Sequence, residues 1–425
     1  MRILYITTEL PYPLSSGFLR HYHFLRHLGQ RHAITYLSLT RKDAVSAVTY
    51  AALAPYAAPI AVFGDRGSTE PWYVRWVGRL PLAGSRIARA LRLRLAARQL
   101  TAAVHQVLSH HAIDLIVHSG KDTFPAIAHV DDVPVVIDCC DATSLRVAGE
   151  MPFAHWARRL WLQLRLWEVR RIERRIVRKT RHLAFASRRD QQAMLGHTHQ
   201  GEIIPQAVDL GHWTRRQHQP RPNTIVFTGV MSYPPNHDAA LFLIRQILPR
   251  VRQHVPEAEL LVVGRNPLPE LVAAVAGRNW VTLTGEPRDM RDYFELATVC
   301  CAPVRFASGM QFKVLEAMAM EVPVVTTPPA ADGLQIDGAV PPLVVGRSAM
   351  ELAAGIVDLL RRPQERARLA AAGRQYVEEH FVWEHSVAKL EQLCRAASGD
   401  RCAARVPDAP APVAPRSAPQ LTGHP

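Results

Sequence analysis

The sequence predicts an α/β protein of two domains, each a parallel β-sheet covered by helices. Short apolar runs typical of buried strands alternate with helical segments, first in residues 1–204 and again in residues 224–380. A polar stretch at residues 205–223 separates the two series and is expected to form a hinge and linker. The chain has 425 residues, 48% of them hydrophobic, which is enough to build two cores. We therefore expect two Rossmann-like domains.

The first domain begins with a buried type of strand, followed by a turn and a helix. Arg2–Thr7 predicts the strand, the turn contains Gly17, and apolar positions at helical spacing predict a helix at about residues 18–28. The next strand is expected at Ala33–Leu39. The turn lacks the G-x-G-x-x-G pattern, so this start is poor evidence for a bound dinucleotide.

Two further strands of the first domain lead into polar side chains. One strand begins at Ile113 and ends in a polar loop that reaches Lys121, with His118 at its end. Another, Val133–Asp138, runs into a turn that contains Asp141. Ligands of open α/β sheets bind at the carboxyl ends of strands, so these side chains lie where chemistry would occur. The two carboxylates could bind substrate hydroxyl groups, act as a base or cap the following helix, and we favour capping for one of them. A lone histidine is more often structural.

Residues 151–181 have an unusual composition, in which three tryptophans and several leucines are interleaved with ten basic residues. Arginine and tryptophan on one helix suit the headgroup region of an anionic bilayer. The alternative is a helix that packs its Trp and Leu face on the sheet and exposes its arginines. An aromatic and basic stretch also suits nucleic acid, but no recognised DNA-binding or RNA-binding module surrounds it, so no nucleic acid is expected.

The net charge of +14, from 51 Lys and Arg against 37 Asp and Glu, indicates an anionic partner such as a nucleotide, an anionic lipid or nucleic acid. The amino terminus carries too few apolar residues before Glu9 for a signal peptide, and no apolar run approaches the roughly 20 residues of a spanning helix. A cytoplasmic location is therefore expected. The six cysteines lack zinc-type spacing and no D-x-D pattern ends a strand, so no metal site is predicted.

The most informative stretch of the chain is Cys301–Leu334, which reads as strand, loop, helix and strand. Gly309 in the loop permits close approach of a ligand to the backbone, and the helix start offers unpaired N–H groups and a partial positive charge. That arrangement suits a diphosphate. Lys313 in the first helical turn could reach the same phosphates, and Glu316 could accept hydrogen bonds from sugar hydroxyls. The alternative is an ordinary βαβ unit with a Lys and a Glu on its surface.

Residues 308–325, SGMQFKVLEAMAMEVPVV, resemble the donor-sugar loop and helix of family 4 glycosyltransferases, whose signature is similar to G-x-x-x-K-x-L-E-A-M-A-x-G-x-P-V-V. The resemblance is closest to bacterial sugar transferases associated with exopolysaccharide clusters. It implies the GT-B fold, in which two Rossmann-like domains face each other across a cleft. It also implies that a helix at residues 381–395 crosses back to the first domain. Residues 396–425 are rich in Ala and Pro and are expected to be disordered.

The resemblance implies a retaining, metal-independent hexosyltransferase without a cofactor. Its donor would be a nucleoside diphosphate sugar, and its acceptor a glycan or a lipid-linked molecule in exopolysaccharide or cell-surface polysaccharide synthesis. Such an enzyme would be cytoplasmic and could bind the inner face of the cell membrane through residues 151–181. The alternatives are another GT-B enzyme, such as an epimerase or a phosphorylase, and a catalytically silent scaffold or membrane-surface binding protein.

The resemblance also assigns roles to individual residues of the first domain. Gly17 matches a glycine that faces the donor phosphates and the acceptor. His118 matches a histidine near the transferred sugar, and Asp138 and Asp141 lie in a turn that faces the acceptor.

In the second domain we expect a donor site, in which other groups replace the Arg and Lys that the family usually places after Gly229. Its members are Arg265, Arg305, Lys313, the backbone amides of Gly309, Met310 and Gln311, and Glu316 as the ligand of the ribose. Lys313, Arg305 and the backbone amides would also act in catalysis by stabilising the departing diphosphate. His118 is expected to act in catalysis beside the transferred sugar and the acceptor.

Three departures from the family pattern bear on this assignment. The turn after Gly229 lacks the usual Arg and Lys, Ser308 stands where the first Glu of an acidic pair is expected, and Glu321 replaces the usual Gly before Pro323. The first departure shifts phosphate binding to other groups, and the second removes a carboxylate from the donor loop.

Overall fold

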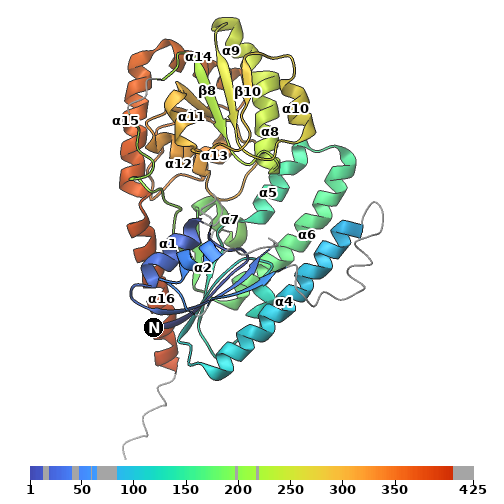
Figure 1. Ribbon diagram of the computed structural model, residues 1–425, viewed down its shortest axis with the longest axis vertical. Coiled ribbons are helices and arrows are strands. Elements are labelled where there is room, and N and C mark those ends of the chain that lie inside the picture. Colours follow the sequence, from blue (N-terminus) through green and yellow to red (C-terminus); the bar gives the residue numbers. More distant parts are fainter. Residues whose placement is uncertain are drawn as a thin grey trace, which may run out of the picture.

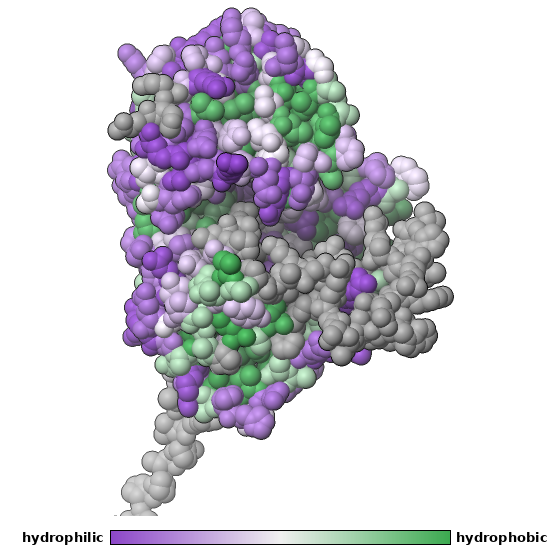
Figure 2. Space-filling model, in the orientation of Figure 1, coloured by the Kyte–Doolittle hydropathy of each residue, from purple (hydrophilic) through white to green (hydrophobic). Residues whose placement is uncertain are grey.

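The computed structural model describes residues 1–12, 19–40, 47–58, 60–64, 84–196, 200–216 and 220–404. The chain forms two lobes, one above the other in Figure 1, and each lobe contains a parallel sheet between helices. The space-filling view shows a recess between the lobes (Figure 2). Two Rossmann-like domains are therefore confirmed.

The first sheet has seven parallel strands in the order β3-β2-β1-β4-β5-β6-β7. The strands are β1 (Arg2–Thr7), β2 (Ala33–Thr40), β3 (Ile60–Gly64), β4 (Leu115–Ser119), β5 (Val135–Asp138), β6 (Leu183–Phe185) and β7 (Glu202–Ile203). The helices are α1 (Leu19–Leu28), α2 (Ala47–Leu53), α4 (Gly84–His110), α5 (Thr143–Glu150), α6 (Trp156–Lys179) and α7 (Arg188–Leu195), with short 3-10 turns η1 (Phe124–Ala126) and η2 (Met151–Phe153). Helices cover both faces, which explains why the strands read as continuous apolar runs.

The alternation of side chains along β1 divides the first core in two. Ile3 and Tyr5 pack with helix α1, whereas Leu4 and Ile6 pack on the opposite face with helix α4. The described strand residues of β1 beyond Arg2 are buried, so a single strand anchors both layers.

The second sheet has six parallel strands in the order β10-β9-β8-β11-β12-β13. The strands are β8 (Thr224–Thr228), β9 (Glu259–Val263), β10 (Val281–Leu283), β11 (Val299–Ala302), β12 (Val324–Thr326) and β13 (Val344–Val345). The helices are α8 (Pro234–Phe242), α9 (Leu248–His254), α10 (Pro269–Val275), α11 (Arg291–Leu296), α12 (Phe312–Ala319), α13 (Pro328–Asp332), α14 (Ala349–Arg361) and α15 (Pro363–His380), and a π-helical turn η3 (Leu243–Ile247) joins α8 to α9.

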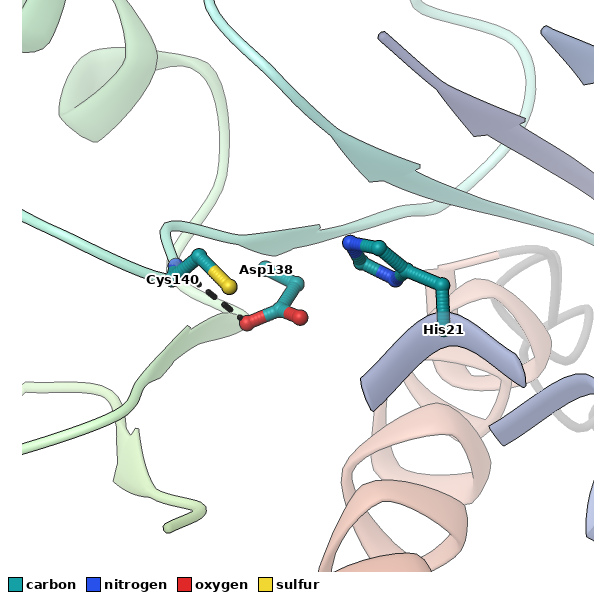
Figure 3. Close-up of side chains that lie close together, drawn as sticks. All are labelled: His21, Asp138 and Cys140. Atoms are coloured by element: carbon teal, nitrogen blue, oxygen red, sulfur yellow. Dashed lines mark hydrogen bonds between the residues drawn. The ribbon is translucent and has the colours of Figure 1, made fainter. Parts of the chain in front are cut away.

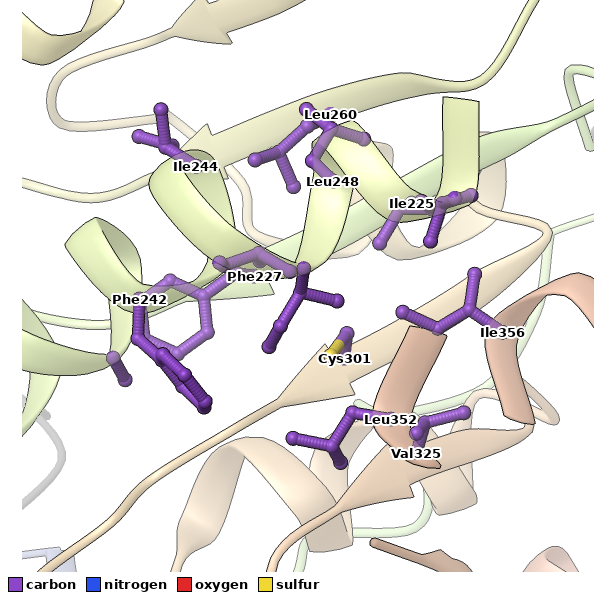
Figure 4. Packing of buried hydrophobic residues seen from close by; sticks show 14 of the residues in the cluster. Ile225, Phe227, Phe242, Ile244, Leu248, Leu260, Cys301, Val325, Leu352 and Ile356 are labelled. Atoms are coloured by element: carbon purple, nitrogen blue, oxygen red, sulfur yellow. The ribbon is translucent and has the colours of Figure 1, made fainter. Parts of the chain in front are cut away.

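The core of the second domain lies on both faces of β8. Ile225 and Phe227 face a cluster that includes Leu248 and Ile356 from the helices on one side (Figure 4). Val226 faces the opposite cluster, which contains the buried side of α12. This packing fixes α12, and the loop before it, relative to the end of β8.

The last helix, α16 (Trp383–Ala404), crosses from the second domain to the first (Figure 1). Trp383 stacks on His23 of α1 with ring centroids 4.2 Å apart, and Leu390 and Ala397 are buried in the first-domain core. The predicted crossing helix is thus confirmed. The prediction of a disordered tail from Ala396 is wrong for residues 396–404, because alanine favours helix and Ala397 has a core to pack against.

The carboxyl ends of the two sheets meet between the domains. Arg189, which follows β6, donates hydrogen bonds to the backbone oxygens of Ala307, after β11, and Pro329, after β12. In each sheet the strand order reverses at the first strand, between β1 and β4 and between β8 and β11. Ligands of open α/β sheets bind at such switch points, so the site is expected between the domains.

Candidate functional site

The loop between β11 and α12, residues 303–311, forms the second-domain side of the site. Gly309 has φ +64°, a left-handed conformation that other residues adopt only with strain. The loop faces the first domain, because the backbone N–H of Gln206 in the hinge donates to Sδ of the buried Met310 at 3.2 Å. Gln311 occupies the position before the first turn of α12, and its side chain makes no capping hydrogen bond.

Lys313 turns back from α12 toward the end of β8. Its Nζ donates to Oδ1 of Asn236 at 2.8 Å and to Oε1 of Gln311 at 3.2 Å, and lies 5.7 Å from the centre of the Phe227 ring. Burial lowers the pKa of the Lys313 ammonium to about 8. A poorly solvated cation with only neutral hydrogen-bond partners favours an incoming anion.

Glu316 lies one turn along α12 from Lys313 and is partly buried. Burial raises its pKa to about 7, while the charge of Lys313 acts in the opposite direction. The two predicted donor residues are therefore neighbours, as their spacing in the sequence indicates.

The turn after β8 completes this corner through its backbone. A Cβ on Gly229 would lie 2.5 Å from Nδ2 of Asn236, and one on Gly264 would lie 1.7 Å from the oxygen of Gly229. Nδ2 of Asn236 donates to the oxygen of Val230 at 3.1 Å. The glycines thus let Asn236 fit against the turn and hold Lys313. No sequence motif predicts the role of Asn236, because nothing near it in the sequence marks its contact with Lys313.

The two arginines predicted for the donor site are already paired. Nε of Arg305 donates to Asp238 at 2.9 Å, and the guanidinium lies over the rings of Phe153 and Phe242 at 4.1 and 4.7 Å. Arg265 pairs with the exposed Glu286 at 3.3 Å. Lys313 differs from these two arginines. In the described part of the chain its hydrogen-bond partners are neutral, and none is a carboxylate.

Two carboxylates of the first domain contact the second-domain loop. Oγ of Ser308 donates to Oδ2 of Asp141 at 2.6 Å, and the backbone N–H of Gly309 donates to Oδ1 of Asp190 at 3.0 Å. Asp190 is buried, and burial raises its pKa, while hydrogen bonds from Ala142, Ser187 and Gly309 oppose the shift. The Ser187-x-x-Asp190 spacing signals a helix cap, which Ser187 does form, but it does not signal a contact between domains.

Asp138, predicted to bind the acceptor, is buried and paired with Arg20. Nε and Nη2 of Arg20 donate to its two oxygens at 2.7 and 3.1 Å, and Nη1 donates to the backbone oxygens of Ile204 and Pro205. The pair joins β5, α1 and the hinge. Asp138 has its oxygens engaged by Arg20, and we assign it a structural role in place of the predicted one.

His118 is fully buried at the end of β4, where its Nε2 lies 2.9 Å from Oγ1 of Thr123. Burial lowers its pKa to about 3, so the ring is neutral at physiological pH. Its Nδ1 has no hydrogen-bond partner among the described residues. Its predicted role beside the transferred sugar stays a prediction. Gly17, the other predicted first-domain member, lies outside the described residues.

His21, Asp138 and Cys140 place potential metal ligands within 4.8 Å of one another (Figure 3). The surroundings fit a cation poorly, because the guanidinium of Arg20 already neutralises Asp138. Burial raises the pKa of the Cys140 thiol well above its usual range, which keeps it protonated. We derive no metal chemistry from this cluster.

Helix α6 buries one face and exposes its tryptophans. Leu162 and Leu166 pack against Val147 of α5, whereas Trp156 is 77% exposed and Trp167 is 66% exposed. The alternative in which the tryptophans pack on the sheet is therefore wrong. In the described part of the chain, no helix is long and apolar enough to cross a membrane.

Residues 222–362 match the family model described as Glycosyl transferases group 1. A GDP-mannose-dependent alpha-(1-6)-phosphatidylinositol monomannoside mannosyltransferase of Mycolicibacterium smegmatis is 27% identical over 164 residues, which are 36% of this chain and 43% of the relative. A GDP-mannose-dependent monoacylated alpha-(1-6)-phosphatidylinositol monomannoside mannosyltransferase of Corynebacterium glutamicum is 29% identical over 159 residues, 35% of this chain and 42% of the relative. These matches span less than half of each relative.

Solved structures show the same fold over nearly the whole chain. Anabaena Alr3699/HepE in complex with UDP and glucose has a TM-score of 0.64 at 15% identity, covering 93% of this chain and 100% of that one. WaaG, a glycosyltransferase involved in lipopolysaccharide biosynthesis, has a TM-score of 0.57 at 12% identity, covering 92% and 99%. The fold is thus that of the GT-B class.

The second domain is thus similar to the group 1 glycosyl transferases over residues 222–362. The chain as a whole has the GT-B fold.

Proposed function

We propose that the protein transfers a hexose-type sugar from a nucleoside diphosphate sugar to a glycan or lipid-linked acceptor, with retention of configuration. The observation that carries this proposal is the corner formed by Lys313, Asn236 and the Gly229 turn, at the carboxyl ends of β8 and β11 and beside the interdomain recess. A diphosphate bound there would place its sugar toward the first domain. We propose a role in exopolysaccharide synthesis because residues 308–325 resemble the donor loop of sugar transferases associated with exopolysaccharide clusters.

In this proposal, the second domain stabilises the charge that develops on the departing diphosphate. Lys313 is already desolvated and held by Asn236 and Gln311, so little reorganisation is needed when charge appears. With a pKa of about 8 the ammonium is mostly protonated at neutral pH, and a bound diphosphate favours that form further. Glu316, one turn away, would accept hydrogen bonds from the ribose hydroxyls.

Retention in this scheme does not need a protein nucleophile. The leaving phosphate itself can take the acceptor proton, so the carboxylates near the loop are free for binding. Lys313 supplies a positive charge at the diphosphate, which is the part that a divalent ion plays elsewhere.

We propose a lipid-linked acceptor at the inner surface of the membrane because of helix α6. Trp156, Leu164 and Trp167 are exposed along one stripe of the helix. Arg170 and Arg174 next to them make no ion pair or hydrogen bond with another described residue, so both are available to lipid phosphates. The names of the curated relatives, which act on phosphatidylinositol mannosides, agree with a lipid acceptor.

The test has two stages. Purified protein is screened for thermal stabilisation by UDP-, GDP- and ADP-sugars, and the stabilising donor is then offered with polyprenyl-linked and phosphatidylinositol-linked acceptors in vesicles. Transfer of the sugar, with the anomeric configuration kept in the product, is expected. Donor hydrolysis without transfer, epimerisation or phosphorolysis would contradict the proposal.

A second candidate, a catalytically silent membrane-binding protein, is favoured by Ser308 and by the absence of Arg and Lys in the turn after Gly229. It predicts vesicle binding without any nucleotide-sugar binding. Calorimetry with the donors named above separates the two.

A further inference from the structure

The contact between Asp141 and Ser308 joins the two domains at the donor loop. Oγ of Ser308 donates to Oδ2 of Asp141 at 2.6 Å, and the Asp141 side chain remains 41% exposed. Its other oxygen, Oδ1, lies 3.7 Å from Nζ of Lys121 and makes no hydrogen bond to a described residue. A carboxylate oxygen is thus exposed next to the loop that the proposed function assigns to the donor.

The contact is held in place by a buried support. Oδ1 of Asp190 accepts from the N–H of Ala142, next to Asp141, at 2.9 Å and from the N–H of Gly309, next to Ser308, at 3.0 Å. One oxygen therefore binds the backbone on both sides of the contact. Asp190 is 1% exposed, so competition from water is small. The pairing of Asp141 with Ser308 follows from this backbone support and not from two mobile side chains.

Sugar hydroxyl groups are suitable hydrogen-bond partners for Oδ1 of Asp141. Sugar hydroxyls donate hydrogen bonds. At neutral pH an ionised carboxylate is the side-chain group that accepts them most strongly. A sugar joined to a diphosphate at Lys313 is expected to lie beside the loop that precedes α12. Of the two first-domain carboxylates that contact this loop, Asp190 is buried and Asp141 is partly exposed. Lys121 also donates to the backbone oxygen of Asp141 at 3.0 Å, which fixes the segment.

We propose that Asp141 binds hydroxyl groups of the transferred sugar, supplying from the first domain the carboxylate that the donor loop lacks at Ser308. Ser308 is then a positioning residue that orients Asp141. The inference rests on the proposed function and names the residue that selects the sugar part of the donor. It separates two parts of donor recognition, since the second domain holds the nucleotide and Asp141 of the first domain holds the sugar.

The experiment compares each nucleoside diphosphate with its sugar, using UDP against UDP-glucose and GDP against GDP-mannose, by calorimetry on the full chain without acceptor. In Asp141→Asn, which keeps an oxygen for Ser308, the affinity for the nucleoside diphosphate is expected to stay within about twofold. The affinity for the donor sugar is expected to fall about tenfold. Asp131→Asn, an exposed carboxylate paired with Lys179, is the matched control and should change neither affinity.

A rescue distinguishes a binding role from a structural one. Asp141→Ala is expected to lose the preference for the sugar-bearing ligand, and Ser308→Glu in that background is expected to restore it in part, because the carboxylate returns from the opposite side of the contact. A variant that had lost only the packing of the domains would not be rescued in this way.

The remaining outcomes distinguish failure of this inference from failure of the proposed function. Equal preference for the donor sugar in wild type and Asp141→Asn would overturn the inference, as would a variant in which the acceptor KM alone rises. A flat titration of the wild-type protein with UDP, GDP and ADP would instead refute the proposed function, because the nucleotide part does not depend on Asp141.

Discussion

The corner around Lys313 and the surface of helix α6 are both cationic, yet they are built in opposite ways. Lys313 is buried and held by two neutral side chains at 2.8 and 3.2 Å. Helix α6 presents exposed tryptophans and arginines, of which Arg165 pairs with Glu168 and Arg158 with Glu150. Arg170 makes no such pair with another residue that the structure describes.

The difference indicates two kinds of recognition. A desolvated charge at a fixed position interacts strongly with one ligand geometry and weakly with all others. Many exposed groups add small contributions to any anionic surface, and salt screens them. We expect single substitutions to be severe in the corner and gradual on α6.

The largest effect is expected for Lys313→Ala. Loss of the ammonium should lower kcat/KM for the donor about 100-fold, or about 2.7 kcal/mol, as for other groups that stabilise charge in the transition state. Steady-state kinetics measure it, and a circular dichroism spectrum checks the fold. Lys389→Ala on α16 serves as control, because that lysine lies on the crossing helix, where it donates to the oxygen of Ile203 at 3.5 Å and lies 4.0 Å from Asp337. Activity near the wild-type level in Lys313→Ala would remove it from the site.

The surface of α6 should respond next most strongly, but in a different assay. Replacing Trp156 and Trp167 together with alanine is expected to weaken binding to anionic vesicles about 30-fold, roughly 2 kcal/mol, since both rings are exposed and available to the interface. Affinity for soluble nucleotide should not change. Met350→Ala, another exposed apolar residue on the second domain, is the control. Vesicle binding that survives the double substitution would place the membrane contact elsewhere.

Glu316→Ala compares the contribution of Glu316 with that of Lys313 in the same corner. Loss of the acceptor for the ribose hydroxyls should weaken donor use about tenfold, or about 1.4 kcal/mol, less than the loss of Lys313. A 2′-deoxyribose donor should lose part of its affinity for the wild type and none for the variant. If both donors behave alike in the wild type, Glu316 does not bind the ribose.

The sequence predicts the local features of the site but not the contacts between residues that are far apart in the chain. The parallel sheets, the donor loop and the pair Lys313 and Glu316 follow from local periodicity and spacing. Asn236 lies 77 residues from Lys313, and Asp190 lies 119 residues from Gly309. No local pattern encodes such contacts, because the end of a strand is predictable but the residue that meets it from another strand is not.

Helix α6 and Asp138 show the same limit in other ways. Tryptophan and arginine on one helix fit both a membrane face and a core face, and only the packing of Leu162 and Leu166 on α5 decides which side is exposed. Asp138 follows a strand as a binding carboxylate would, but Arg20, 118 residues away, pairs with it. A buried carboxylate needs a positively charged partner, and the sequence alone does not show that Arg20 is the partner of Asp138.

The smallest effect is expected from pH, and it separates the corner from α6 without a substitution. Burial lowers the pKa of Lys313 to about 8, so its charged form is lost as pH rises through that value. The arginines of α6 stay charged in this range. Between pH 7.5 and 8.5 nucleoside diphosphate affinity should fall about threefold, which is the loss of the protonated fraction at a pKa of about 8. Vesicle binding should stay constant. In Lys313→Arg the slope should vanish, and a slope that persists there would assign the titration to another group.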